Sequence, residues 1–126
     1  MTASTPEIAP TIEFFRGIPE ELSNVSLRRE KRTGLRNVLM TFERLNALER
    51  FNSFTKEFSQ SLSLIDSEGE IAVEPDSVRF FFAGDEGDEL RRVECKFAIE
   101  RDDHWDRFMR FMQRYAEANG MAYGDR

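Results

Sequence analysis

The chain has 126 residues, a formal net charge of -6 and an isoelectric point near 4.9, a balance that argues against a nucleic-acid-binding protein. Its single cysteine, Cys95, excludes an internal disulfide, and no apolar run reaches the roughly 18 residues that a membrane span requires. Residues 1–10 lack the basic start and apolar centre of a signal peptide. We therefore expect a soluble protein of a reducing compartment.

Alternation of apolar and polar residues predicts three strands in the first third of the chain. Gly17 ends the first strand, and residues 18–20 are expected to form a turn. Residues 33–34 are a short, turn-like link that should join the next two strands as a hairpin. The expected strands span residues 11–16, 25–32 and 37–43.

Residues 46–58 allow two interpretations. Apolar side chains recur there at a helical interval, and Asn46 followed by Glu49 resembles a capping box, which favours one or two helical turns. The alternative is a loop whose phenylalanines fill the edge of the core, and for residues 53–58 neither reading is preferred. The apolar side chains concerned are Ala47, Phe51, Phe54 and Phe58.

Three further strands are expected in the second half of the chain, the second of them in two pieces. Residues 66–70 should form a hairpin turn, Pro75 interrupts the strand that follows, and an acidic loop spans residues 83–89. The last strand has the cleanest alternation, with Cys95 on its inward side. The expected strands span residues 59–65, 71–73, 78–82 and 91–99.

Helical periodicity is clearest near the C-terminus, where six apolar residues fall on one stripe. Asp102 and Asp103 suit the first turn, because carboxylates accept free N–H groups and favour the positive end of the helix dipole. Gly120 suits the end of a helix. We expect a helix at about residues 103–118, packed on a sheet. Its stripe consists of Trp105, Phe108, Met109, Met112, Tyr115 and Ala116.

Together these elements predict an α+β domain over residues 11–120, with a flexible N-terminal tail at 1–10 and a short C-terminal tail at 121–126. Because the links are short, one antiparallel meander of five or six strands is expected. The C-terminal amphipathic helix should cover its apolar face, and a short helical segment lies near residues 46–58.

Residues suited to catalysis or metal binding are few. His104, the single histidine, is expected in an exposed first helical turn, and Cys95 in the core. Residues 66–70 lack the ligand spacing of a calcium loop, and residues 85–89 are better explained as a solvated turn. Phosphate-binding glycine patterns and a nucleophile elbow are also missing. The sequence therefore predicts no catalytic, cofactor-binding or metal-binding residue, and a protein that is not an enzyme.

A basic strip interrupts the otherwise acidic chain around its second and third strands. It can face acidic protein loops or anionic lipid head groups, which makes it the candidate partner-binding surface. The same charges can instead protect an edge strand from aggregation, and the pattern favours neither reading. The strip consists of Arg28, Arg29, Lys31, Arg32 and Arg36.

The C-terminal helix also carries a recognisable motif. Residues 105–116, WDRFMRFMQRYA, resemble the C-terminal signature of the photosystem II reaction-centre 28 protein family, also called the W protein. Residues 64–71 are similar to that family's hairpin around Glu-Gly-Glu, and residues 79–80 stand where the family has Lys-Phe. The resemblance covers about residues 11–120. Further matches are Ile12, Glu13, Phe14, Gly17, Val25, Leu27 and Arg29.

The sequence departs from the family pattern at four places. Residues 61–63 are Ser-Leu-Ser where the family has Gly-Met-Tyr, and residues 77–78 lack the usual Asn. The segments at 43–58 and 82–90 are longer. These departures suggest a divergent paralogue, similar to the second copy that many cyanobacteria carry.

The resemblance implies a non-catalytic accessory factor, peripheral to the cytoplasmic side of the thylakoid membrane. Such factors bind photosystem II assembly or repair intermediates near the core chlorophyll-binding antenna protein and the reaction-centre subunits, and the antenna's tail adds to the sheet. An exposed sheet edge offers backbone groups for that kind of strand addition. The alternatives are a small-ligand-binding or enzymatic domain with a pocket between sheet and helix, and a weak homodimer with paired edges.

Overall fold

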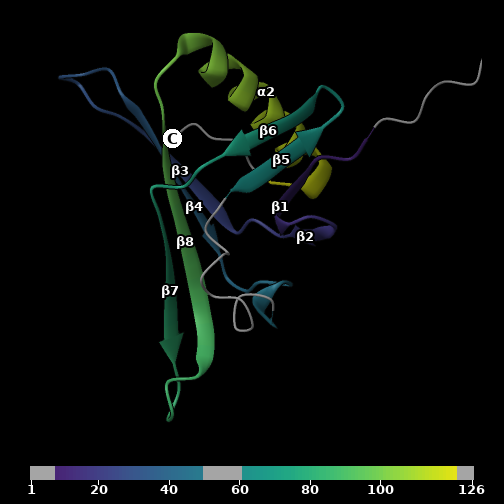
Figure 1. The fold of residues 1–126 in the computed structure, drawn as a ribbon, viewed down its shortest axis with the longest axis vertical. Coiled ribbons are helices and arrows are strands. Elements are labelled where there is room, and N and C mark those ends of the chain that lie inside the picture. Colours follow the sequence, from purple (N-terminus) through teal and green to yellow (C-terminus); the bar gives the residue numbers. More distant parts are fainter. Residues whose placement is uncertain (1–7, 50–60, 122–126) are drawn as a thin grey trace, which may run out of the picture.

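The strands form two antiparallel sheets, and a C-terminal helix, α2, lies beside them in the computed structural model (Figure 1). The structure describes residues 8–49 and 61–121. Sheet A has the order β2-β1-β5-β6, and sheet B has the order β3-β4-β8-β7. The bounds are β1 Thr11–Phe15, β2 Ile18–Glu20, β3 Asn24–Arg29, β4 Arg36–Phe42, β5 Leu62–Asp66, β6 Gly69–Val73, β7 Ser77–Ala83, β8 Glu89–Ile99 and α2 Asp102–Asn119.

The α+β class is confirmed, but the strands form two sheets of four instead of one meander of five or six. The hairpins that short links predict are present, because β3 pairs with β4, β5 with β6, and β7 with β8. The partition into two sheets comes from pairs that are distant in the sequence. β1 pairs with β5, and β4 pairs with β8. Local periodicity carries no information about such pairs.

A second correction concerns residues 18–20, which form the strand β2 instead of a turn. Pro19 is tolerated there because β2 is an edge strand, where a missing N–H need not break a ladder bond. The carboxylate of Glu20 turns inward and accepts hydrogen bonds from the backbone N–H groups of Asn46 at 2.6 Å and Ala47 at 3.0 Å. Residues 48–49 are helical, and the rest of the helical segment expected up to residue 58 lies outside the described residues.

The core lies between the inner faces of the two sheets and α2. Phe14 of β1 meets Phe42 of β4 edge to face at 5.5 Å, which joins sheet A to sheet B. Phe97 of β8 meets Phe108 of α2 in the same way at 5.8 Å. Burial of Cys95 is confirmed, and this burial, with a smaller contribution from the charge of Asp76, raises the pKa of its thiol to about 12.

The helix α2 extends one residue beyond its expected bounds at each end. Its buried side chains include Phe111, which the sequence stripe did not contain, whereas Trp105 and Met109 of that stripe are only half-buried. Gly120 ends the helix in the left-handed conformation with φ of 69°, as its position predicts. His104 is exposed in the first turn, which confirms its expected position.

The predicted turn at residues 66–70 joins β5 to β6, and this hairpin lies along α2 (Figure 1). The side chain of Asp66 is fully buried and accepts hydrogen bonds from the Arg107 guanidinium at 2.7 and 3.0 Å and from Arg114 at 2.9 Å. Burial alone would raise the pKa of Asp66, but these two arginines outweigh it and lower the pKa. Arg110 and Arg114 hold the pKa of Glu68 at about 2.

The acidic residues at 85–89 are all exposed, with residues 85, 86 and 88 in the turn between β7 and β8 and Glu89 at the start of β8. The N–H of Gly87 donates to the carbonyl of Gly84 at 3.1 Å and closes this turn. The expectation of a solvated acidic turn is therefore confirmed. The turn lies at the far end of the long β7–β8 hairpin, away from α2 (Figure 1).

Candidate partner-binding face of sheet B

One face of sheet B is turned away from the core. Side chains alternate along a strand, and Val38 and Met40 of β4 are fully buried, so Asn37 and Leu39 point the other way. The register extends this assignment across the sheet, because Arg28 pairs with Asn37 on the same face. We call this surface the outer face of sheet B.

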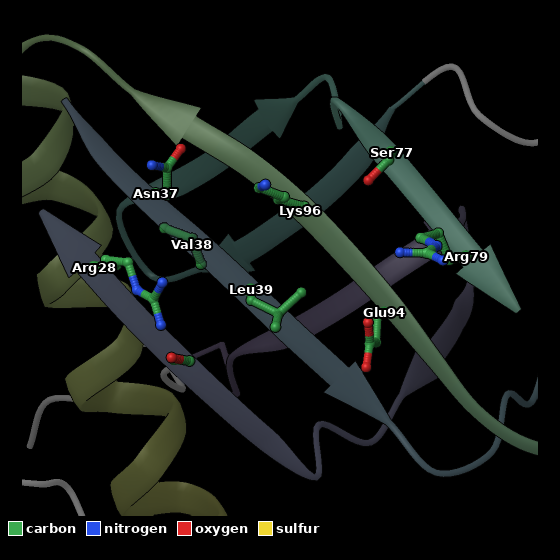
Figure 2. A pocket seen from close by; sticks show the side chains of 9 residues that line it. Arg28, Asn37, Val38, Leu39, Ser77, Arg79, Glu94 and Lys96 are labelled. Atoms are coloured by element: carbon green, nitrogen blue, oxygen red, sulfur yellow. The ribbon is translucent and has the colours of Figure 1, made fainter. Parts of the chain in front are cut away.

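The outer face contains a shallow hollow of 390 Å³ to which all four strands contribute. Figure 2 looks onto this face and labels lining side chains from all four strands; among them Val38 is fully buried toward the core and borders the hollow from below. Its floor is partly apolar at Leu39, and hydroxyl and amide groups offer hydrogen bonds around it. The lining residues are Ser26, Arg28, Asn37, Val38, Leu39, Ser77, Arg79, Glu94 and Lys96.

The hollow has an excess of positive charge. Three of its lining side chains are cations, and one, Glu94, is a carboxylate. Glu94 is already paired, because Arg92 beside it donates a hydrogen bond to its carboxylate at 2.9 Å. In the described part of the chain, Arg28, Arg79 and Lys96 take part in no ion pair. Three unpaired cations therefore line one open face of a protein whose net charge is -6.

The aromatic ring of Phe81 supports two arginines next to the hollow. The guanidinium of Arg92 lies 4.0 Å from the ring centroid and that of Arg79 lies 5.3 Å from it, both within cation–π range. Residues 79, 81 and 92 stand on paired strands, with Arg79 opposite Glu94 and Phe81 opposite Arg92. The positive groups on this side of the sheet are thus held by β7 and β8 instead of by loops.

The structure divides the predicted basic strip. Arg28 stands on the outer face, and Arg29 is exposed next to it in β3. Residues 31–32 are exposed in the loop between β3 and β4. Arg36 turns toward the helix instead: its side chain is 14% exposed, bonds to Asp102 at 2.7 Å and lies over the ring of Trp105 at 5.3 Å. Arg36 therefore joins sheet B to the start of α2.

Sequence reasoning did not include Arg79, Arg92 or Lys96 among the candidate partner-binding residues. A signal was available, because the alternation that places Cys95 inward also places residues 92, 94 and 96 outward. What the sequence alone could not supply is the strand order. The order β3-β4-β8-β7 brings Arg28 onto the same face as cations that stand about fifty to seventy positions later.

A second groove, of 480 Å³, lies where β6, the end of β8 and the start of α2 meet. Its lining includes Glu74, Glu100 and His104, around an apolar floor at Phe97 and Phe108. Within residues 8–49 and 61–121, no hydrogen bond joins these two carboxylates to the imidazole. The groove is the place for the pocket between sheet and helix considered above, but its titratable groups do not form a bonded catalytic set.

The described residues contain no group of three His, Cys, Asp or Glu side chains arranged to hold a metal ion. In the same part of the chain, no helix combines the length and the apolar character that crossing a membrane requires.

These features define a small α+β protein with two packed sheets, a helix closing the core and one open basic sheet face. Residues 12–123 match the family model described as Psb28 protein. The chain belongs to the Psb28 family.

Named relatives can be aligned with this chain over almost their whole length. The chain is 31% identical over 113 residues to a protein of Thalassiosira pseudonana, which covers 89% of this chain and 94% of that relative. It is 32% identical over 117 residues to a protein of Synechococcus elongatus and 30% identical over 117 residues to one of Acaryochloris marina, each covering 92% of this chain and 97% of the relative. All three are named "Photosystem II reaction center Psb28 protein".

Proposed function

We propose that this protein is a non-catalytic accessory factor of photosystem II that binds assembly or repair intermediates as a peripheral protein on the cytoplasmic side of the thylakoid membrane. Family membership and the names of its relatives support the link to photosystem II. The partners we propose are the core chlorophyll-binding antenna protein and the reaction-centre subunits. The proposed contact is a partner tail added as a strand to the β3 edge of sheet B.

The observation that carries this proposal is the open edge of β3. β3 is the outermost strand of sheet B and pairs only with β4 among the described strands. Five of its six residues are exposed, and Leu27 retains 40% of its accessible surface. An unpaired strand of this kind presents N–H and C=O groups that an extended chain can pair with.

The hydrogen-bond phase of β3 identifies which backbone groups are free for a partner. At the end of the hairpin, the Glu30 N–H donates to the Leu35 carbonyl, and the Gly34 N–H donates to the Glu30 carbonyl, both at 2.8 Å. The backbone N–H and C=O groups of Glu30 therefore point toward β4. Because the direction of these groups alternates along an antiparallel strand, those of residues 24, 26 and 28 also point toward β4. Residues 25, 27 and 29 direct their backbone groups outward, to the open edge.

The β2 edge of sheet A suits a partner strand less well. β2 has three residues, one of which is Pro19, so it offers few donors. β3 is longer, and the exposed cations of the predicted strip continue from its end into the loop at residues 31–32. These cations would attract acidic loops of a partner complex. The alternative reading, that they only protect an open edge, predicts that their reversal leaves partner binding unchanged.

A pair of proline substitutions tests strand addition at β3. Leu27→Pro removes an outward N–H and leaves the ladder with β4 intact, whereas Ser26→Pro removes a donor that β4 uses. Leu27→Pro should therefore stay folded and lose capture of photosystem II subunits from solubilised thylakoids, scored by identification of the captured polypeptides. Ser26→Pro should lower the thermal midpoint by more than Leu27→Pro does.

The charged strip is tested separately by Arg29→Glu combined with Lys31→Glu. Both side chains are exposed, so the thermal midpoint should remain nearly unchanged while capture of photosystem II subunits weakens. Unchanged capture by this double variant would remove the strip from the interface. Unchanged capture by folded Leu27→Pro would remove the β3 edge.

A further inference from the structure

The outer face of sheet B has a charge pattern that the β3 edge alone does not explain. Arg28 lies beside that edge, but Lys96 is on the central strand β8 and Arg79 is on the far edge strand β7. All three line one hollow and lack an ion-pair partner in the described part of the chain. A partner that only paired with β3 would leave the cations of β7 and β8 unused.

From these contacts we infer that the outer face of sheet B binds an acidic polypeptide segment, which carries two or three carboxylates within about seven residues. This inference rests on the proposed function, because it names the chemistry of the partner at the same sheet. It extends the interface from the β3 edge across the hollow to Arg79 on β7.

The expected length of the segment follows from sheet geometry. Arg28 and Arg79 stand on the first and fourth strands of sheet B, which are separated by three strand spacings. At about 4.8 Å per spacing this is about 14 Å across the sheet. The register adds an offset along the strands, because Arg28 lies level with Ala98 of β8 and Arg79 lies level with Glu94. The backbone positions of the two arginines are therefore about 20 Å apart, a distance that an extended chain covers in about six to seven residues. Carboxylates at the two ends and near the middle of such a segment could meet Arg28, Lys96 and Arg79.

The cations are arranged for carboxylates before any partner arrives. The Arg79 side chain lies over Phe81, and Glu94 is neutralised by Arg92, so it offers little repulsion to an incoming acid. Guanidinium edges can donate two parallel hydrogen bonds to one carboxylate. Groups held on paired strands lose less conformational freedom on binding than the loop cations at residues 31–32 would.

A polypeptide fits this face better than an anionic membrane surface does. The hollow offers the side chains of Ser26, Asn37 and Ser77, which can hydrogen-bond to a peptide backbone. The exposed large apolar side chains of sheet B are on its other side, because Leu27 stands opposite Val38 and Phe82 stacks on Phe80, which packs against the core. On the outer face, Leu39 lies in the floor of the hollow and Phe81 lies under Arg79 and Arg92, so neither projects as a bilayer-inserting group would. The cations also surround a hollow instead of projecting from a protruding surface.

The direct test uses a fluorescein-labelled peptide, Glu-Asp-Ser-Glu-Ser-Asp-Glu, and a matched amide peptide, Gln-Asn-Ser-Gln-Ser-Asn-Gln, titrated by fluorescence anisotropy at low salt. The acidic peptide should bind and the amide peptide should not. Combining Arg79→Glu with Lys96→Glu should weaken binding by about tenfold or more, and the neutral pair Arg79→Gln with Lys96→Gln by less. Added salt should weaken binding to the unmodified protein.

The matched control reverses two exposed arginines elsewhere, Arg44→Glu with Arg101→Glu, and should leave peptide binding within about twofold. An equal loss in both double variants would overturn the inference, because it would show attraction to total charge only. Absence of binding to the unmodified protein would also overturn it. Vesicles of equal parts phosphatidylcholine and phosphatidylglycerol test a membrane as the alternative partner. If the unmodified protein binds these vesicles and Arg79→Glu with Lys96→Glu abolishes the binding, the face is assigned to membranes instead.

The peptide-binding experiment can succeed or fail independently of the test of strand addition at β3. Leu27→Pro should not affect the acidic peptide, because it leaves the three cations in place. If Leu27→Pro retains photosystem II capture while the peptide behaves as expected, strand addition fails and the acidic site remains. If the charge reversal leaves peptide binding unchanged while Leu27→Pro loses capture, the acidic site fails and strand addition remains.

Discussion

Replacement of Asp66 by Asn tests how the β5–β6 hairpin is held on α2. The carboxylate is fully buried, and Arg107 and Arg114 bond to it from the helix, with side chains 19% and 37% exposed. Removing one member of a buried ion pair costs about 3–5 kcal/mol. Because both arginines reach water in part and Asn keeps one acceptor, we expect a smaller loss of unfolding free energy, about 2–4 kcal/mol at pH 7.

Urea unfolding followed by fluorescence of the single tryptophan, Trp105, measures this loss. The matched control is Asp85→Asn, which makes the same charge change in the exposed turn between β7 and β8. That control should shift the unfolding free energy by no more than about 0.5 kcal/mol. A loss below about 1 kcal/mol for Asp66→Asn would contradict a stabilising role for the buried carboxylate.

The pH dependence provides an independent check on the same residue. The arginines lower the pKa of Asp66 in the folded state, so its contribution is fully present above the unfolded value of about 3.9 and is lost as the pH falls through the lowered pKa. The difference between the unmodified protein and Asp66→Asn should therefore shrink in acid. A difference that stays constant from neutral pH to strong acid would refute this assignment.

Three further substitutions or reactions probe other contacts. Tyr115→Phe should cost about 1–3 kcal/mol in urea unfolding, because the Tyr115 hydroxyl accepts the buried N–H of Leu22 at 3.0 Å and its loss leaves that donor unpaired. Cys95 should resist iodoacetamide in the native protein and react after unfolding, because burial raises its pKa to about 12. Arg36→Ala should lower stability by about 1 kcal/mol and shift the tryptophan emission, since it removes the bond to Asp102 and a stacking contact.

The sequence was sufficient for several local features, although residues 18–20, predicted as a turn, form β2. The helix was predicted to within one residue at each end, because its period and Gly120 lie in one short stretch. The hairpin between β3 and β4 and the turn at residues 66–70 were predicted for the same reason. These elements follow from periodicity and turn chemistry, which act over a few neighbours.

Features that depend on distant residues were not predictable in this way. From the sequence, Asp66 is an ordinary acidic residue of a turn. In the structure β5 packs on α2, and Arg107 and Arg114, more than forty positions later in the sequence, bond to its carboxylate. From the sequence, Arg36 belongs to an exposed basic strip, but in the structure the start of α2 covers its side chain. In each case the charge is visible in the sequence, but its partner is fixed by the sheet pairing and the position of the helix.

The division into two sheets also bears on how a partner can bind. Sheet A is held to α2 by the buried Asp66 cluster, whereas sheet B contributes Phe97 to the same core and keeps its outer face open. A ligand on that face therefore meets strands whose other side is already packed, so binding need not reorganise the core. This arrangement predicts that the acidic peptide raises the thermal midpoint of the unmodified protein but not of Arg79→Glu with Lys96→Glu. An equal rise in both proteins would mean that the peptide acts away from the outer face of sheet B.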